Sequence, residues 1–192
     1  MKYVHPVISE HQALEKLSKK GLFQRAAPLQ RIELVYLPFF LHTFEISRSN
    51  RTSRLRALCD AVTGVVVVPD DGFKPHFHAH GESRDYLIEP RLDAESAQEI
   101  AREEIMQLVL REAFKQPLGR ELNIRQVTVS EIALPYWIAY TKKGERYSIK
   151  TIDGSTGVKV GFRLKSALLA GLTVPPGRST GAQKNCNQSP LA

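Results

Sequence analysis

The stretch LPFF at residues 37–40 is similar to LPYW at residues 134–137, and this internal similarity decides the fold that we predict. A second pair of similar stretches follows in the same order, DAVTGVVV at residues 60–67 and DGSTGVKV at residues 153–160. The separation from proline to aspartate is 22 residues in the first copy and 18 in the second. A period of roughly 95 residues is too long for a solenoid repeat. The matching order therefore predicts a duplicated small domain.

Each predicted repeat begins with a helix. In the first repeat, Ser9 and Gln12 have the spacing of a capping box, and residues 13, 14 and 17 form one apolar stripe. In the second, Asp93 is placed to cap a longer helix that runs to about residue 115, with apolar residues at helical spacing. We therefore expect a short helix and a long helix, one at the start of each repeat.

Strands are expected after each helix, because residues 31–46, 123–140 and 147–152 are rich in aromatic and β-branched side chains. The D-x-x-T-G element predicts a tight turn, in which the aspartate accepts backbone hydrogen bonds and the glycine takes a positive φ. Pro38 and Pro135 cannot donate to a strand ladder, so we expect both at a sheet edge or a bulge. Each repeat then has the order helix, strand, hairpin, strand, turn, strand.

These patterns predict an α+β protein of two related modules, each a helix packed on a small antiparallel sheet. The first module is expected to span residues 1–70 and the second residues 92–174. Residues 71–91 are expected to form a linker between them, because they begin with loop-forming residues. Residues 175–192 are polar and are expected to form a disordered tail.

Three stretches of the second repeat carry a resemblance to a known family. They are the helix ESAQEIAREEI, the hairpin through YWIAY and RYSIKTID, and the closing DGSTGVKV. The chain resembles the PepSY family in these stretches, as two degenerate copies. The matching positions are Ala97 and Ala101 in the helix and Asp153, Thr156 and Gly157 in the turn, with Asp60, Thr63 and Gly64 kept in the first copy. The resemblance implies a cystatin-like helix on an antiparallel sheet, and a non-catalytic role in inhibition or regulation through protein contacts.

The net charge of +7 is concentrated at the end of the chain. Five lysines and arginines follow Asp153, the last acidic residue, so residues 1–153 carry only 22 basic minus 20 acidic side chains, or +2. The whole-chain charge is therefore weak support for nucleic-acid binding. Two cysteines far apart do not predict a disulfide framework. With neither a signal-peptide pattern nor an apolar run long enough to span a bilayer, we expect a soluble cytoplasmic protein without membrane insertion.

The segment KPHFHAHGE contains His76, His78 and His80 at alternating positions. On an extended chain these three side chains share one face, where their imidazoles would bind a metal such as zinc. The alternative is a polar linker, which the flanking loop-forming residues favour. Zinc at these histidines is the only cofactor that the sequence suggests.

Two hairpin tips are predicted to be basic. The positive side chains are Arg48, Arg51, Arg54 and Arg56 in the first repeat and Lys142, Lys143 and Arg146 in the second. Such tips can contact phosphates of a nucleic acid or another anion. The alternative, which we favour because no nucleic-acid motif accompanies them, is that charge protects hairpin ends and sheet edges.

Phe40 and Trp137 are the last residues of the two aromatic motifs. Either side chain is a candidate contact for a protein partner, and core packing is the alternative. The chain has no GxSxG, HExxH, Walker or dinucleotide-binding motif. We therefore expect a non-enzymatic binding or regulatory protein that acts through contacts with a protein partner. The alternatives are a metal-binding accessory protein and a protein that binds nucleic acid or another anion.

Overall fold

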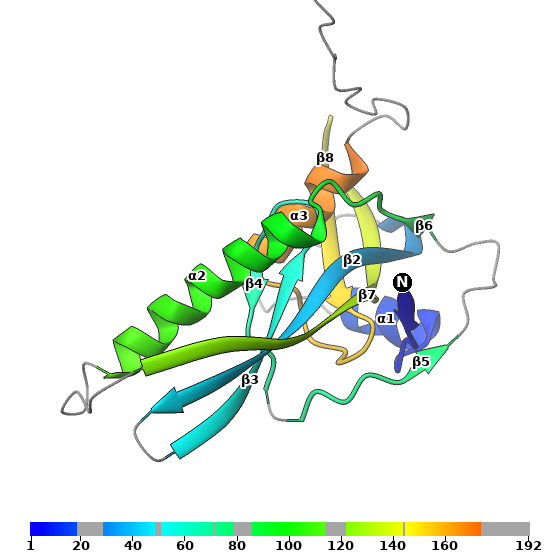
Figure 1. The fold of residues 1–192 in the computed structure, drawn as a ribbon. Coiled ribbons are helices and arrows are strands. Elements are labelled where there is room, and N and C mark those ends of the chain that lie inside the picture. The colour runs from blue at the N-terminus through cyan, green and yellow to red at the C-terminus, as the bar shows by residue number, and fades with distance from the viewer. Residues whose placement is uncertain are drawn as a thin grey trace, which may run out of the picture.

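Figure 1 shows the computed structural model of the chain, which describes residues 1–18, 29–48, 51–70, 72–78, 86–113, 122–143 and 145–173. The elements in chain order are β1 (Lys2–Val4), α1 (Glu10–Ser18), β2 (Leu29–Arg48), β3 (Arg51–Asp60), β4 (Val66–Val67), β5 (Phe77–His78), β6 (Tyr86–Leu87), α2 (Ala94–Ala113), β7 (Leu122–Lys143), β8 (Arg146–Asp153) and α3 (Phe162–Leu172). The predicted α+β class is confirmed. The tail predicted at residues 175–192 lies outside the described residues.

Two long antiparallel strands, β2 and β7, form the centre of the sheet (Figure 1). Residues 35–40 and 132–139 are buried on both faces, which is why these stretches are continuously apolar instead of alternating. Leu37 lies directly opposite Leu134, its equivalent in the other repeat. The pairs on either side follow the same symmetry. An approximate two-fold axis through the Leu37–Leu134 pair therefore relates the two copies of the motif.

The prediction of two modules with separate small sheets is wrong. One eight-stranded sheet has the order β4-β3-β2-β7-β1-β5, with β6 paired to β2 and β8 paired to β7. It is a mixed sheet, since β1 runs parallel to β7 and β6 runs parallel to β2. Within either repeat alone, β2 or β7 would have an unpaired edge, and pairing the two strands satisfies the backbone groups of both. The boundaries expected at residues 70 and 92 therefore do not separate two sheets.

Pro38 and Pro135 lie inside the central strands, where no register shift occurs, and not at an outer edge or a bulge. The carbonyl oxygens of both prolines accept from the turn after the next strand, Pro38 from Ala61 N at 2.9 Å and Pro135 from Gly154 N at 2.7 Å. Along β2, Pro38 falls between the residues that pair with the end of β6 and those that pair with the end of β3. Along β7, Pro135 falls between the residues that pair with β1 and those that pair with β8. Each missing N–H therefore faces a break between two partner strands, where no ladder bond is lost.

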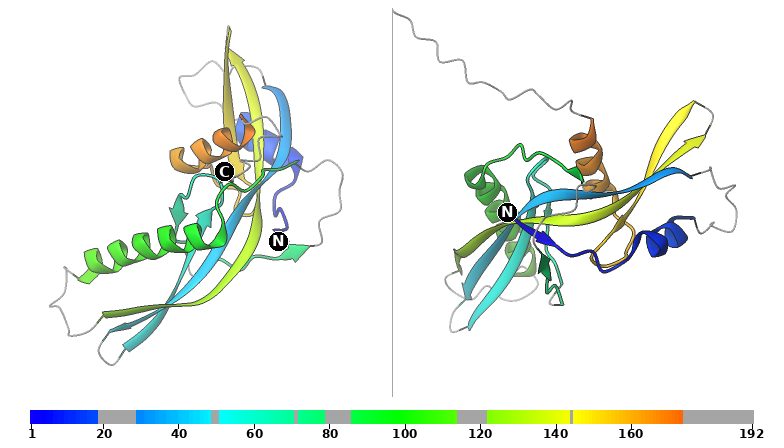
Figure 2. Two further views of the ribbon diagram at one scale, coloured as in Figure 1. Left: turned by 45° about the horizontal axis from the view of Figure 1, so that its top comes forward. Right: turned by 90° about the vertical axis from the view of Figure 1, so that its right-hand side faces the viewer.

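The helix of each repeat packs on the strands of the other repeat. The long helix α2 covers β2 and β3, where Ala97, Ala101 and Ile105 are buried against Phe40 and Phe44. The short helix α1 contacts β7 and β8, where Leu17 packs with Ala139 and Ile152, and it also contacts β2 of its own repeat. Figure 2 shows the two helices near opposite ends of the long strands. The predicted packing of each helix on its own module is therefore wrong for α2, whereas α1 packs on strands of both repeats.

The segment before each helix is fixed by hydrogen bonds to the other repeat. Arg91 N and Leu92 N donate to the carbonyl oxygen of Ala61, just before α2 begins. Before α1, Val7 N and Ile8 N donate to the carbonyl oxygen of Gly154 in the same way. Both helices begin as predicted, because Ser9 and Gln12 form a reciprocal capping box and Asp93 Oδ1 accepts from Ser96 N at 2.8 Å. Equivalent hydrogen bonds in the two repeats therefore place the start of each helix beside the other repeat.

The predicted D-x-x-T-G turns are confirmed in both repeats. Gly64 N donates to the carbonyl oxygen of Asp60, and Gly157 N donates to that of Asp153. The two glycines have φ values of 76° and 70°, which side chains other than glycine rarely adopt. Each turn brings the chain back beside β3 or β8, through β4 in the first repeat and an isolated bridge of Lys159 to Ile152 in the second.

The opposite face of the sheet is covered by α3 and by residues around Phe73. Ala167 and Leu168 of α3 are buried against a core that includes Leu37, Leu134 and Ile138. Figure 2 shows α3 and α1 on opposite sides of the sheet. Within the described part of the chain, no helix is long and apolar enough to cross a membrane.

Candidate functional site

The three predicted metal ligands do not form a described cluster. Phe77 and His78 form β5 and pair with β1, so part of the expected linker is a strand of the sheet. The His78 ring lies 5.4 Å from that of His5 in an edge contact, and its Nε2 lies 3.5 Å from the Tyr36 hydroxyl oxygen. His76 is exposed, and His80 lies outside the described residues. Among the described residues, no group of three or more His, Cys, Asp or Glu side chains is placed to hold a metal ion.

The basic tips of the two hairpins lie at opposite ends of the sheet. Arg48, at the tip of the β2–β3 hairpin, pairs with Leu122 at the start of β7, whereas Thr141, near the tip of β7–β8, pairs with Leu29 at the start of β2. A 20-residue strand, at about 3.3 Å per residue, separates the tips by roughly 60 Å. The two tips therefore do not combine into one anion-binding surface.

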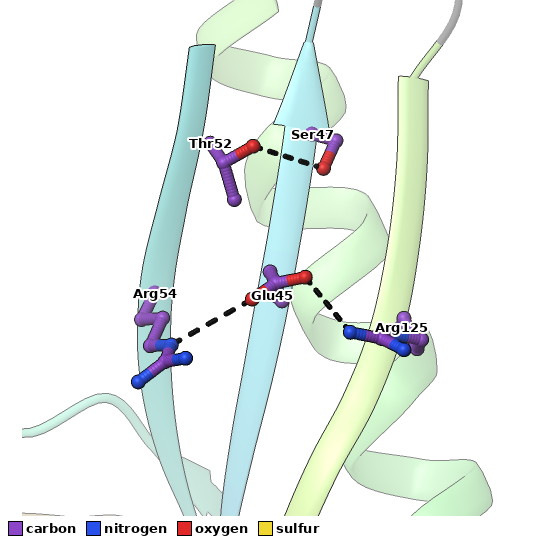
Figure 3. A network of polar contacts seen from close by, with 5 residues as sticks. All are labelled: Glu45, Ser47, Thr52, Arg54 and Arg125. Carbon is purple, nitrogen blue, oxygen red and sulfur yellow. Dashed lines mark hydrogen bonds and ion pairs between the residues drawn. The ribbon is translucent and has the colours of Figure 1, made fainter.

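The described arginines of the first tip are engaged within the chain. Figure 3 shows Glu45 of β2 between Arg54 of β3 and Arg125 of β7, with N–O distances of 3.7 and 3.0 Å. Arg56 lies over the ring of Phe73, with 5.6 Å between its guanidinium carbon and the ring centroid. Exposed ion pairs of this kind contribute little to stability, but they hold these cations against the sheet.

The other predicted anion-binding side chains are less defined. The side chains of Arg48, Arg51, Lys143 and Arg146 lie outside the described part of the structure, although their backbones belong to the strands. Lys142 is exposed. Binding of an anion at either tip therefore stays a prediction.

Phe40 and Trp137 are core residues, as the alternative interpretation predicted. Phe40 is only 5% exposed and packs under α2 with Phe44 and Cys59. Trp137 is 8% exposed, and its indole N–H donates to the carbonyl oxygen of Ile8 at 3.0 Å. This bond helps to fix the segment that leads into α1. Neither side chain is available to a partner on the surface of this structure.

The first part of β7 has an open edge. On one side, residues 122–131 pair with β2, and on the other side β1 pairs with β7 only at Ile132 and Ala133. Among the described residues, no strand pairs with the outer side of residues 122–131. Val127 is 40% exposed and Val129 is 44% exposed on this edge. We call residues 126–130 of this strand the β7 edge.

The β7 edge lacks the charged side chains and prolines that usually protect an open strand. Its sequence, QVTVS, is uncharged and contains three β-branched residues between Arg125 and Glu131. Open strand edges usually carry charged side chains or prolines, which prevent pairing with other chains. The open part of β3, on the other side of β2, follows that rule, since Arg51, Arg54 and Arg56 lie within six residues. A register shift where Thr43 and Phe44 pair with Thr128 and Gln126 places Val127 at an irregularity, which is the one protective feature of the edge.

The sequence analysis missed the β7 edge. The QVTVS stretch was expected to be part of a strand, but a pattern of side chains does not tell which strands have a neighbour on both sides. The available signal was a run of β-branched residues without charge, in which the apolar residues are not needed for the core. It would have marked the segment as unprotected only after its place in the sheet was known.

Comparison with family models, curated protein sequences and solved structures gives no match. The resemblance to PepSY domains therefore stays a prediction that rests on the motifs in the sequence.

Proposed function

We propose that this chain is a non-enzymatic binding protein that acts through contacts with a protein partner, and that the partner binds at the β7 edge. The observation that carries this proposal is an unpaired, uncharged strand segment with two exposed valines. Unpaired backbone N–H and C=O groups on such an edge can bind an extended peptide by strand addition. The main-chain bonds supply affinity, and alternate side chains supply specificity.

The chemistry of the edge indicates the kind of segment that it accepts. Val127, Thr128 and Val129 favour β-branched or aromatic neighbours across the strand pair. The basic side chain of Arg125 precedes the edge and the acidic side chain of Glu131 follows it. We therefore expect the partner to contribute an extended, uncharged segment of about five residues with alternating apolar side chains.

The alternatives lack a comparable observation. Metal binding is supported by no cluster of ligands among the described residues. Anion binding is not favoured by two basic tips that lie at opposite ends of the sheet, with Arg54 and Arg56 already in contact with Glu45 and Phe73. Binding through an open strand edge requires neither a ligand cluster nor a joint basic surface.

Affinity capture with a matched pair of variants tests the proposal. The immobilised wild-type chain, Val129→Lys and Val158→Lys are incubated with cell extract, with and without a chelator and a nuclease, and retained proteins are identified by mass spectrometry. Val129→Lys places a charge on the edge, whereas Val158, 63% exposed, lies outside it. We expect the wild type and Val158→Lys to retain the same protein, and Val129→Lys to lose it.

The treatments separate the competing functions. Retention that survives chelator and nuclease and depends on Val129 supports the proposal. Retention that is equal in all three chains contradicts the place of the contact. Loss of binding with chelator or with nuclease instead favours the metal-binding or nucleic-acid-binding alternative. Circular dichroism of each variant verifies that the lysine has not unfolded the sheet.

A further inference from the structure

A cavity of about 260 Å³ lies on the face of the sheet opposite α1 and α2. Its apolar floor consists of Phe39, Leu58, Leu134 and Tyr136, and Leu164 of α3 also lines it. A neighbouring hollow of about 270 Å³ shares four lining residues with it, Asp70, Phe73, Ser155 and Thr156. None of these residues belongs to the β7 edge. A concave apolar site with a few polar groups is the usual form of a small-molecule site.

Tyr136 gives this cavity a polar group at its floor. The side chain is 1% exposed and lines the cavity. Burial, together with the negative charges of Asp153 and Asp60, raises the pKa of Tyr136 well above its ordinary value. The hydroxyl therefore stays protonated and can both donate and accept.

The two D-x-x-T-G turns differ at the cavity. In the first repeat both carboxylate oxygens of Asp60 are used, since Oδ1 accepts from Val62 N and Thr63 N, and Oδ2 accepts from the Thr63 hydroxyl and Val65 N. In the second repeat Oδ1 of Asp153 accepts from the backbone and hydroxyl of Ser155 and from Thr156 N.

The hydrogen bonds just described for the second turn use only one carboxylate oxygen of Asp153, Oδ1. The Thr156 hydroxyl oxygen accepts from Val158 N at 3.3 Å, in contrast to the Thr63 hydroxyl, which donates to Asp60 at 2.8 Å. Oδ2 of Asp153 consequently has no partner among the described residues. Asp153 is only partly buried and lines the cavity. The turn that is closed in one repeat therefore presents a free acceptor in the other.

The charge of the cavity selects the kind of ligand. Asp70 and Asp153 both line it, and the described residues of its lining include no lysine, arginine or histidine. Lys74, His5 and His76 line only the neighbouring hollow. Neither carboxylate forms an ion pair with a described residue. An anion would be repelled by two carboxylates in a partly buried site, whereas a cation would be attracted by both. An apolar floor below two unpaired carboxylates fits a ligand with an apolar body and a positive end.

We propose that this cavity binds a small organic amine, with its aromatic or branched apolar body on Phe39, Leu134 and Leu164. The ammonium donates to Oδ2 of Asp153, and Asp70 at the mouth adds attraction. The Tyr136 hydroxyl supplies a further polar contact at the floor. The site is separate from the proposed protein contact and can bind its ligand whether or not a partner occupies the β7 edge.

Titration calorimetry with three matched probes tests this site. The probes are 2-phenylethylamine, 2-phenylethanol and phenylacetate, which share the ring and differ in charge. We expect the amine to bind about tenfold more tightly than the alcohol, because only the ammonium carries a positive charge that Asp153 and Asp70 attract. Phenylacetate should bind most weakly. Equal binding of amine and alcohol, or tighter binding of the acid, overturns the assignment.

Variants of the full-length chain locate the binding. Asp70→Asn and Asp153→Asn should each weaken binding of the amine toward that of the alcohol, and Leu164→Trp should fill the cavity and abolish binding of all three probes. Glu131→Gln, which removes an exposed carboxylate elsewhere, should bind the amine as the wild type does. Because Asp70 is exposed, Asp70→Asn should not disturb folding even where Asp153→Asn does. Unchanged binding in Leu164→Trp or in Asp70→Asn contradicts the proposed site.

Discussion

The equivalent aspartates of the two repeats differ in burial and in hydrogen bonding. Asp60 is fully buried, and four hydrogen bonds satisfy its carboxylate. Asp153 makes the same backbone turn but leaves one oxygen open to a cavity. The two turns differ in sequence, since Ser155 adds a hydroxyl that donates to Asp153 where the first repeat has Val62, and they also differ in what surrounds them. Leu92 and Ile100 close over Gly64 in the first repeat, whereas Lys16 and Ile8 lie beside Gly157 in the second.

His42 is a residue whose role only the structure reveals. Its ring is fully buried between Phe40 and Phe44, on the face that α2 covers. Its Nδ1 lies 3.2 Å from Gln126 Oε1, and its Nε2 is buried without a partner. Since Gln126 Nε2 donates to Gln98, its Oε1 accepts from the imidazole, and a proton added at Nε2 would have no acceptor.

Stability should therefore fall in mild acid because of His42. Burial lowers the pKa of His42 below its ordinary value of 6.5, an effect that the hydrogen bond from the imidazole to Gln126 opposes only in part. The unfolded chain then binds a proton more readily than the folded chain, so the contribution is complete above about pH 6.5 and is lost as the pH falls below it. Urea unfolding at about pH 7.5 and about pH 5.5 should show a larger loss for the wild type than for His42→Leu.

The control for this prediction is the exposed His76. His76→Gln should keep the pH dependence of the wild type, because His76 is exposed and lies outside the core cluster that surrounds His42. A wild-type dependence that persists unchanged in His42→Leu would assign it to other groups.

At the scale of single elements, α2 is fitted to its place by small residues. Ala97 and Ala101 are both fully buried and lie one helical turn apart, where they face Ala57 and Cys59 of β3. Small side chains on both surfaces let the helix approach the sheet closely. The alanines that suggested a family helix are therefore packing residues here, and they pack against the other repeat.

A larger side chain at this contact should destabilise the fold. Ala101→Leu adds three carbon atoms where no space exists, and overpacking of this kind costs about 1–3 kcal/mol. Thermal unfolding followed by circular dichroism measures the loss. The matched substitution Glu103→Leu, on the exposed side of the same helix, should change stability by less than about 0.5 kcal/mol. Equal effects of the two leucines would contradict the close helix–sheet contact.

At the scale of the whole molecule, the exchange of helices makes the two repeats interdependent. Without α2, the first repeat would expose the apolar surface around Phe40, Phe44 and Cys59. Without α1, the second would expose Ala139 and Ile152 and would lose the bond from Lys150 Nζ to the carbonyl oxygen of Leu17. The pairing of β2 with β7 joins them further. The chain should therefore unfold as one cooperative unit.

Separate halves of the chain test this interdependence. Fragments of residues 1–90 and 91–192, expressed alone, should each lack the dispersed amide spectrum of a folded protein, because each has lost the helix that covers its strands. Mixing the two should restore the dispersion, since all the contacts of the sheet are again present. A folded spectrum from either fragment by itself would show that the exchange is not needed for stability.

The sequence by itself determined the local structure of this protein. The capping residues Ser9 and Asp93, the turns at Asp60 and Asp153, the positive φ of Gly64 and Gly157, and the long strands follow from chemistry between residues near one another in the chain. The duplication itself was visible because its motifs keep their order.

Only the tertiary structure decided against which repeat each helix and strand packs. The pairing of Leu37 with Leu134, the exchange of α1 and α2 and the uncovered β7 edge depend on contacts between residues far apart in the chain. A hydrophobic pattern indicates which face of a helix is buried. It does not indicate which of two similar apolar sheet surfaces that face packs against. The cavity beside Asp153 could not be predicted from the sequence for the same reason. Its lining comes from β2, β3, β7, α3 and loops, which lie together only in the folded chain.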